Sequence, residues 1–341
     1  MSEKYFAAQN SAKGFISYFA ENLRGDRAER CYIIKGGPGV GKARLMSELA
    51  AAAEEKGARI EYYYCSSDPV SLDGLFITLA DGSTLSVLDG TLPHDEDAGV
   101  PGARDELIDL GAFWNAAQLR SRRGEIDELM HQKQTAFTRA YKCLAAAGEL
   151  SEAARELRFS CADKVSIAAL AANIAAQLTP SRRMRTPLSA VGMRGSFYHD
   201  SFRVAAAHCI GVKDNDGCKV GELFFGAVRD ALGGNCRWSP DLLLPQLCEG
   251  LIAGDTAVIG AIAEDKRTVD ISHLVDEGAY ERVWREESAL EAAKEMAFSS
   301  AKSAFAEASA AHFALEEIYS AAMDFSKKEE YSRYLCKHVL A

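Results

Sequence analysis

The sequence lacks the features that mark secreted, membrane-spanning or zinc-binding proteins. Its nine cysteines are scattered singly over 341 residues, with no C-x-x-C pair and no cysteine–histidine spacing of the zinc type. Unclustered thiols in odd number are typical of a reducing compartment. The start of the chain, Met1–Tyr5, has no apolar signal core, and the most apolar stretch, Ser166–Leu178, is too short to cross a bilayer. We therefore expect a cytoplasmic protein without a membrane span.

Basic charge is scarce as well. The chain has 39 Lys and Arg against 49 Asp and Glu, a formal net charge of −10 at pH 7. Broad nucleic-acid binding needs a basic surface, so this balance argues against it. The hydrophobic content of 48% and charged content of 26% are ordinary for a globular protein, and the length suits two domains.

Glycine, in contrast, is concentrated in one stretch near the N-terminus. A short apolar run, Cys31–Ile34, predicts a buried strand, and Leu45 and Leu49 have the spacing of a helix. Between them, Gly36-x-x-x-x-Gly41-Lys42 fits the phosphate-binding loop G-x-x-x-x-G-K-[ST] at every position but the last. Glycines allow successive backbone N–H groups to turn towards one anion, and the helix adds the positive end of its dipole.

The sequence thus predicts a P-loop that binds ATP or GTP with Mg²⁺. Lys42 is expected to contact the outer phosphates. The residues assigned to nucleotide binding are consecutive: Gly36, Gly37, Pro38, Gly39, Val40, Gly41, Lys42, Ala43 and Arg44. Ala43 departs from the motif, because Ser or Thr at that place gives a hydroxyl to Mg²⁺. A water can fill that coordination position, so we expect binding to survive and turnover to be slow.

Two aspartates are candidates for holding Mg²⁺ or positioning water. The predicted strand Ile60–Cys65 leads to Asp68, and the strand Leu85–Leu88 leads to Asp89. Ligands bind at the carboxyl ends of strands in open α/β sheets, which favours both, Asp89 before Asp68. The alternative is that each aspartate only caps its turn. The dipeptide Asp81-Gly82 predicts a hairpin turn directly before the strand that contains Leu85–Leu88.

Two other charged clusters receive weaker assignments. The loop 94–97 is interpreted as a solvated acidic loop because its spacing fits no metal geometry. Arg120, Arg122 and Arg123 are interpreted as a solvated helix face, with a phosphate-clamping lid as the alternative.

The remaining periodicity is helical. A helix is expected within residues 5–23, before the first strand. Apolar residues at helical spacing over about 116–158, with a break near Gly148, predict a helical hairpin, and a similar stretch covers about 280–325.

An internal repeat joins these elements into one architecture. The stretch His208–Val220 can be laid over the P-loop, with Lys219 falling on Lys42, 177 residues earlier. We therefore expect an α/β protein with a P-loop NTPase-like three-layer parallel sheet, duplicated in tandem as domains 1–178 and 187–341, each with a helical hairpin. Asp214 and Asp216 replace the glycines of the second loop and would repel a triphosphate, so the second copy is expected to bind no nucleotide.

Several motifs of the first half resemble an uncharacterised bacterial family of tandem P-loop ATPase-like proteins. They are Ile33–Leu45, Cys65–Pro69 with Ser71–Gly74, Leu88–Thr91 with Pro93-His94, and Pro101–Ala103. That family usually has two G-x-P-G-x-G-K-[ST] loops in one chain. The resemblance implies ATP binding and leaves hydrolysis open. It matches Gly36, Gly39, Gly41 and Lys42 to the nucleotide-binding loop, whereas Ala43 and the loop Asp214–Lys219 depart from it.

Three hypotheses of function follow. The first is a slow ATPase whose nucleotide controls how the two halves pack, with catalytic roles for Lys42, Asp89 and Asp68. The second is a small-molecule kinase, with Asp68 as base and the arginines at 120–123 as a clamp. The third is a regulator that binds nucleotide without turnover and uses its alanine-rich helices to contact a protein partner or a second copy.

Overall fold

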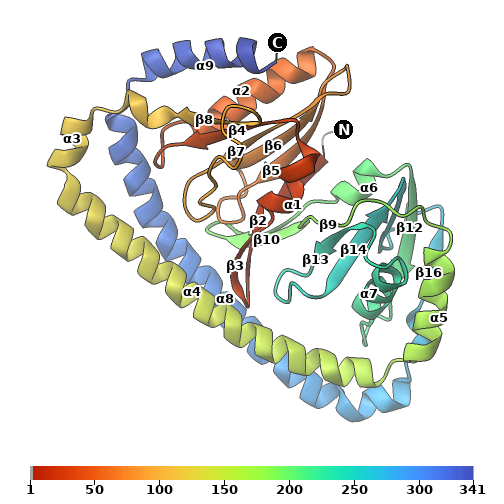
Figure 1. Cartoon of the computed structure of the whole chain (residues 1–341). Helices are drawn as coiled ribbons and strands as arrows, with labels where there is room; N and C mark the ends of the chain where they lie inside the picture. The colour runs from red at the N-terminus through yellow and green to blue at the C-terminus, as the bar shows by residue number, and fades with distance from the viewer. Residues whose placement is uncertain (1–2, 341) are drawn as a thin grey trace.

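The computed structural model describes residues 3–340 and shows an α/β protein built on two mixed six-stranded sheets (Figure 1). The first sheet contains the predicted strands before and after the glycine-rich loop. In spatial order its strands are β1 (Glu3–Phe6), β5 (Arg59–Tyr64), β6 (Leu72–Thr78), β7 (Thr84–Asp89), β4 (Arg30–Lys35) and β8 (Asp105–Asp109).

The second sheet repeats this order and this pattern of pairings. From the β1-like edge, its strands are β9 (Met184–Arg185), β13 (Arg237–Pro240), β14 (Cys248–Ala253), β15 (Thr256–Gly260), β12 (His208–Lys213) and β16 (Thr268–Asp270). Every parallel or antiparallel pair of the first sheet has a pair of the same sense in the second. The internal repeat seen in the sequence is thus a repeat of sheet topology.

The sheets are not fully parallel, and that part of the prediction is wrong. β6 runs against both neighbours in the first sheet, as β14 does in the second. The cause lies in the connections. Gly82, at φ +90°, turns β6 directly into β7, and Gly254, at φ +59°, turns β14 into β15. Strands joined by so tight a turn must be antiparallel.

The helix predicted within residues 5–23 is present over only four residues. The segment forms β1, the hairpin strands β2 (Ala8–Ser11) and β3 (Gly14–Ser17), and only a short helix, α1 (Phe19–Asn22). Gly14, at φ +87°, makes the hairpin turn, so the apolar residues that follow lie on a strand. The second half matches it with β10 (Ser189–Gly192), β11 (Gly195–Tyr198) and α6 (Ser201–Ala205).

Two long helices replace the two predicted hairpins. After α3 (Ala116–Ser121), α4 (Arg123–Ser160) is one unbroken helix and packs along α8 (Glu277–Ala321) (Figure 1). Gly148 does not break α4. A Cβ at this glycine would lie 2.3 Å from the Cβ of Ala12, so the residue is small because β2–β3 packs against it. The prediction of a hairpin in each half is therefore corrected to one pair of helices, one from each half.

The helices α4 and α8 are antiparallel, and an isolated β-bridge joins the adjoining segments at each end of the pair. Trp114 bridges to Met323 at one end, and Ala162 bridges to Val275 at the other. Short 3₁₀ turns lead into these junctions from the sheets. The 3₁₀ helices of the chain are η1 (Gly25–Arg27), η2 (Leu110–Phe113) and η3 (Ser272–Leu274).

Each long helix carries the last helix of its half across to the other sheet. α5 (Lys164–Ala175) shares a core with α7 (Gly221–Ala231) on the second sheet. α9 (Phe325–Val339) shares a core with α2 (Lys42–Glu55) on the first sheet, as Figure 1 shows. The packed units are therefore discontinuous in sequence: residues 1–178 and 187–341 exchange their final helices.

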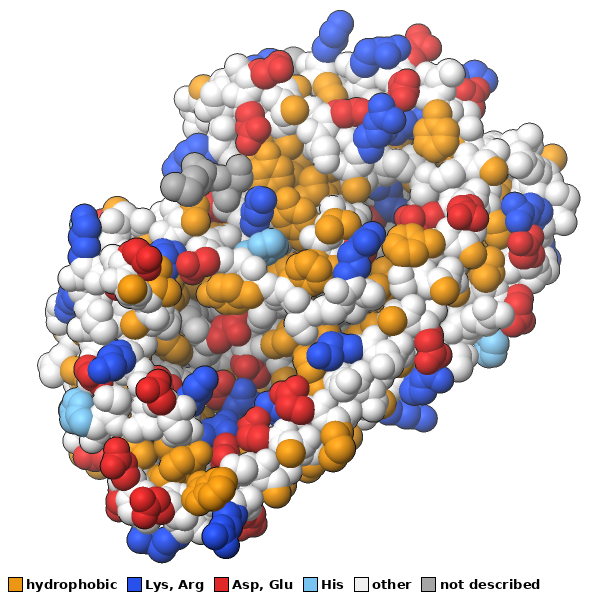
Figure 2. All heavy atoms as spheres, turned by 180° about the vertical axis from the view of Figure 1, so that it is seen from behind, with side chains coloured by type: hydrophobic (Ala, Val, Ile, Leu, Met, Phe, Trp, Pro, Cys, Tyr) orange, Lys and Arg blue, Asp and Glu red, His pale blue; other side chains and the backbone are white. Residues whose placement is uncertain are grey.

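The inner faces of the two sheets meet in a common core. Tyr5, Ile33 and Leu88 of the first sheet pack in one cluster with Phe202 and Ile259 of the second half. On the outer surface, acidic and basic side chains are interspersed over the face seen in Figure 2. Among the helices within residues 3–340, none is both long and apolar enough to span a membrane.

Candidate functional site

The glycine-rich loop between β4 and α2 has the backbone that its sequence predicts. Gly36, Gly39 and Gly41 have φ values of +151°, +69° and +86°, which only glycine adopts at little cost. The backbone N–H of Gly39 faces the carboxylate of Glu316, whereas the N–H groups of residues 40–44 donate to no acceptor within residues 3–340. They line the start of α2, whose dipole adds positive potential. The loop therefore presents donors suited to an anion.

Lys42, the first residue of α2, turns back over this loop. Its Nζ donates to the carbonyl oxygens of Gly36 and Gly37 at 3.0 and 2.8 Å. It also lies 3.5 Å from Oδ2 of Asp89. β7 pairs with β4 so that Asp89 lies opposite Ile34, which brings this carboxylate to the loop. The structure thus brings together two of the three residues assigned to catalysis.

Asp89 uses its two carboxylate oxygens differently. Oδ1 accepts hydrogen bonds from the backbone N–H and hydroxyl of Thr91, at 2.9 and 2.6 Å, which is the turn-capping role. Oδ2 faces Lys42. Burial raises the pKa of Asp89 and the neighbouring Asp73 raises it further, while Lys42 opposes the shift. The turn-capping interpretation of Asp89 is therefore confirmed at Oδ1, and the role towards Mg²⁺ or water stays a prediction for Oδ2.

The residues present suit Mg²⁺ only in part. Ala43 offers a methyl group that packs against the apolar core beneath α2. Within residues 3–340, no three His, Cys, Asp or Glu side chains gather as a metal site. Mg²⁺ keeps several waters and binds through one or two carboxylates plus phosphate oxygens. Asp89 is the side chain that would hold such an ion, directly or through water.

Asp68 lies at the same edge of the sheet but has another partner. Its Oδ1 is 2.5 Å from Nε of Arg194, in the turn between β10 and β11. That arginine comes from the second half of the chain. Asp68 is therefore part of the contact between the halves, and the kinase hypothesis, which needs a free base here, receives no support from this geometry.

The C-terminal part of α8 packs directly on the loop, which the sequence did not indicate. A Cβ at Gly39 would lie 2.6 Å from both the Glu316 carbonyl oxygen and Ser320 Oγ, and a Cβ at Gly37 would lie 3.0 Å from Tyr319. Ser320 Oγ donates to the carbonyl of Gly39 at 2.9 Å. Gly37 is therefore required for contact with the helix, and Gly39 both for this contact and for its positive φ.

A basic pair from the two long helices faces the same edge. Lys133 Nζ on α4 is 3.2 Å from Nδ1 of His312 on α8. Burial and the charge of Lys133 lower the pKa of His312 to about 4, so this imidazole is neutral at pH 7 and accepts the hydrogen bond. Burial and the charge of Lys42 likewise lower the pKa of Lys133. No local motif marks these residues, because they lie far from the loop in sequence.

The second loop is filled by its own side chain. Asp214 Oδ1 accepts from the N–H groups of Asn215 and Val220 at 2.8 and 3.0 Å, and Oδ2 accepts from Gly221 at 2.7 Å. A carboxylate thus satisfies the start of α7. The superposition of Lys219 on Lys42 is corrected: Lys219 is exposed and precedes the helix.

The other charged clusters have local partners. Arg122 pairs with Glu125 at 2.7 Å and Arg123 with Asp127 at 3.4 Å, both along α4, which fits a solvated face rather than a clamp. The loop 94–97 is not wholly solvated. The side chain of His94 is buried, stacks on Phe19, and lies 3.0 Å from Asp73. Its aromatic neighbours, Phe15 and Phe19, come from the N-terminal segment.

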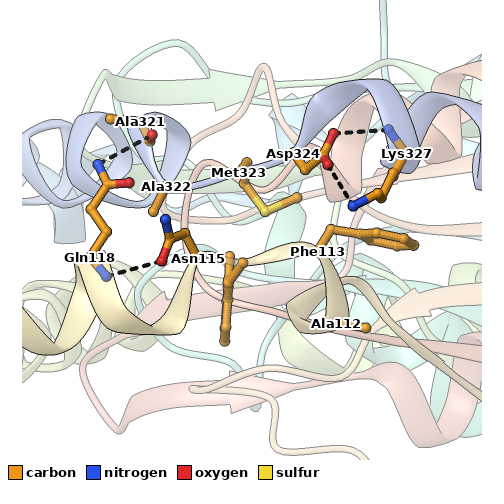
Figure 3. A pocket seen from close by; sticks show the side chains of 10 residues that line it. Ala112, Phe113, Asn115, Gln118, Ala321, Ala322, Met323, Asp324 and Lys327 are labelled. Carbon is orange, nitrogen blue, oxygen red and sulfur yellow. Dashed lines mark hydrogen bonds and ion pairs between the residues drawn. The ribbon is translucent and has the colours of Figure 1, made fainter.

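A cavity of about 410 Å³ opens beside the loop, where α3 meets the junction of α8 and α9 (Figure 3). Met323 and Phe113 lie on it, and Asp324 bonds to Lys327 at its edge. Trp114 lines the cavity, and a Cβ placed on Gly37 would lie 3.3 Å from its ring, so the cavity adjoins the glycine-rich loop.

Comparisons of the chain with models of protein families, with curated proteins and with solved structures returned no significant match. The geometry of the loop therefore carries the functional conclusion on its own.

Proposed function

We propose that the chain is a P-loop protein that binds ATP or GTP at the first loop and hydrolyses it slowly. One contrast supports this most. At the start of α7 the carboxylate of Asp214 accepts the backbone N–H groups, whereas at the equivalent start of α2 these groups have no acceptor within residues 3–340 and Lys42 lies above them. The first loop is suited to an anion from outside the chain, and the second is not.

The roles of the site residues follow from their positions. The N–H groups of the loop would hold the phosphate chain, and Lys42 would turn from the loop carbonyls to the outer phosphates. Asp89 would orient water or hold Mg²⁺, which supplies charge neutralisation when bound. Without a hydroxyl at Ala43, a water would fill this coordination position of the ion, which favours slow turnover or binding alone, as in the regulator hypothesis.

Contacts with α8 support control of packing by the nucleotide. Glu316 and Ser320 touch Gly39. Near its start the same helix reaches the loop between β12 and α7, where the hydroxyl of Tyr280 donates to the carbonyl of Gly217. A ligand that displaces Gly39 must therefore also displace the C-terminal end of α8, because the two are in contact. Nucleotide binding would be transmitted along one continuous helix to the other half.

The first test is the thermal midpoint with ATP, with and without Mg²⁺. At about 100 times its dissociation constant, a ligand adds about 2.7 kcal/mol of stability, which raises the midpoint measurably. The Lys42→Ala variant is expected to lose this rise. The control is Lys219→Ala, which changes an exposed lysine in the second loop. This variant is expected to show the same rise in midpoint as the unmodified protein.

An equal rise in Lys42→Ala, or no rise in the unmodified protein, would contradict the proposed binding. Phosphate release without an added acceptor then separates a slow ATPase from a regulator without turnover.

A further inference from the structure

A second lysine lies beside the loop and has no partner. Lys328, in the first turn of α9, is 1% exposed. A Cβ placed on Gly41 would be 3.4 Å from its Cε and from its Nζ. Within residues 3–340, its ammonium group has no carboxylate within ion-pair distance and no hydrogen-bond acceptor. It is thus a buried cation, directed at the last glycine of the loop.

The placement of Lys328 follows from how α9 lies on α2. Asp324 caps α9 by accepting from the N–H of Lys327 at 3.1 Å. The two helices run in the same direction: Arg44 pairs with Glu329 at their starts, and Lys56 Nζ donates to the carbonyl of Leu340 at their ends. Lys328 therefore lies at the N-terminal end of α2.

The equivalent position in the other half is apolar. α5 lies on α7 as α9 lies on α2, and Asp163 caps α5 as Asp324 caps α9. Counted from these caps, Ile167 corresponds to Lys328 and is 2% exposed in the core. The second loop is filled by the carboxylate of Asp214, and the helix packed beside it carries Ile167. The first loop has no such carboxylate of its own, and the helix packed beside it carries the buried Lys328.

A lone buried cation at this place is unfavourable without an anion. The start of α2 already carries the positive end of the helix dipole, and burying an unpaired charge costs free energy. Burial lowers the pKa of Lys328, and of the charged groups around it Glu48 and Glu329 oppose this shift while Arg44 adds to it. A phosphate group at the loop would compensate both the dipole and the lysine.

We propose that Lys328 is a further nucleotide-binding residue that contacts the phosphate chain at the first loop. In other P-loops, a hydroxyl at the position of Ala43 binds Mg²⁺, and this ion supplies positive charge to the phosphates. Lys328 would supply positive charge to the phosphates directly, so that the nucleotide binds without a divalent ion. This inference rests on the proposed function. It also makes the site composite, because the loop comes from the first half and Lys328 from the second.

The test is Lys328→Met, with Lys337→Met, an exposed lysine on the same helix, as matched control. Thermal midpoints are measured without ligand, with ATP and EDTA, and with ATP and Mg²⁺. Lys328→Met is expected to raise the midpoint without ligand, since an unpaired buried charge is removed. It is expected to weaken ATP binding in EDTA about tenfold or more, the value of a charge-assisted contact. A purely structural lysine would give a lower midpoint and unchanged affinity.

Other outcomes distinguish the two proposals. Unchanged ATP affinity in Lys328→Met overturns the inference alone. If the unmodified protein responds to inorganic tripolyphosphate but not to ATP, the nucleotide is wrong and the role of Lys328 is judged with tripolyphosphate. No response to either overturns both proposals. Lys328→Ile, which introduces the residue found at 167, repeats the test if the methionine variant does not fold.

Discussion

Glu249 on β14 and Asp73 on β6 occupy equivalent positions in the two sheets. Each is followed by a glycine that pairs with the neighbouring strand. The hydroxyls of Ser189 and Ser239 donate to Oε1 of Glu249 at 2.9 and 2.7 Å. Burial raises the pKa of this carboxyl from its ordinary 4.5 to about 7. The folded protein therefore keeps a proton that the unfolded chain releases.

This shift predicts how stability depends on pH. Between about pH 4.5 and 7, the folded state binds more protons at Glu249 than the unfolded state, so its contribution to stability falls as the pH rises and is constant above 7. The loss is about 1.4 kcal/mol for each unit of pKa difference. Glu249→Gln should remove this slope and be more stable than the unmodified protein at pH 8.

Chemical denaturation over pH 4.5–8 measures this effect. Glu152→Gln, at an exposed position of α4, is the control and should follow the unmodified curve. Parallel curves for Glu249→Gln and the unmodified protein would show that Glu249 ionises normally.

Single residues also show which positions a sequence pattern can locate. Lys42 and Asp89 were predicted because a glycine-rich motif and a strand end are local signals, and the structure brings them within 3.5 Å. Lys133, His312 and Lys328 were missed because nothing beside them in sequence marks them. Their role depends on the helices that carry them back to the loop.

At the scale of elements, the start of α7 depends on Asp214. Asp214→Ala would leave the N–H groups of Val220 and Gly221 without their acceptor, so we expect a loss of about 1–2 kcal/mol in the free energy of unfolding. Asp216→Ala changes an exposed residue of the same loop and should stay within about 0.5 kcal/mol. Urea denaturation compares the two; similar losses would mean that Asp214 is not the internal anion of this helix.

Elements were predicted well where their pattern is local. The strand before the loop, helix α2, the strand after it and the turn at Asp81-Gly82 are all present. The direction of β6 was missed although its turn was found, because a parallel sheet had been assumed for all strands. The N-terminal hairpin was missed because four-residue strands separated by Gly14 leave apolar residues at spacings that a helix also fits.

For the whole molecule, the two sheets are joined by a buried cluster of charges. Arg237 of β13 donates to Glu61 of β5 at 2.7 Å, and Arg27 also pairs with this carboxylate. Burial alone would raise the pKa of Glu61, but the two arginines hold it at about 2. Breaking one side of such a cluster leaves a charge buried without its partner.

Arg237→Met is therefore expected to lower the free energy of unfolding by about 3–5 kcal/mol. In the double variant Arg237→Met/Glu61→Gln, part of this loss should return, because the carboxylate left behind is removed as well. Guanidinium denaturation of both single variants and the double variant gives the coupling. Additive losses would show that Arg237 and Glu61 do not stabilise each other across the interface.

The exchange of α5 and α9 also bears on how one half of the chain would behave by itself. A polypeptide that contained only one of the two halves would have to pack its last helix on a second copy of itself. Two such copies would form a symmetric dimer in which each copy packs its last helix on the sheet of the other. Joining them through residues 179–186 turns that dimer into one molecule. Within the single molecule the two loops then differ: Asp214 accepts the backbone N–H groups of the second loop, and Lys328, from the last helix of the second half, lies beside the first.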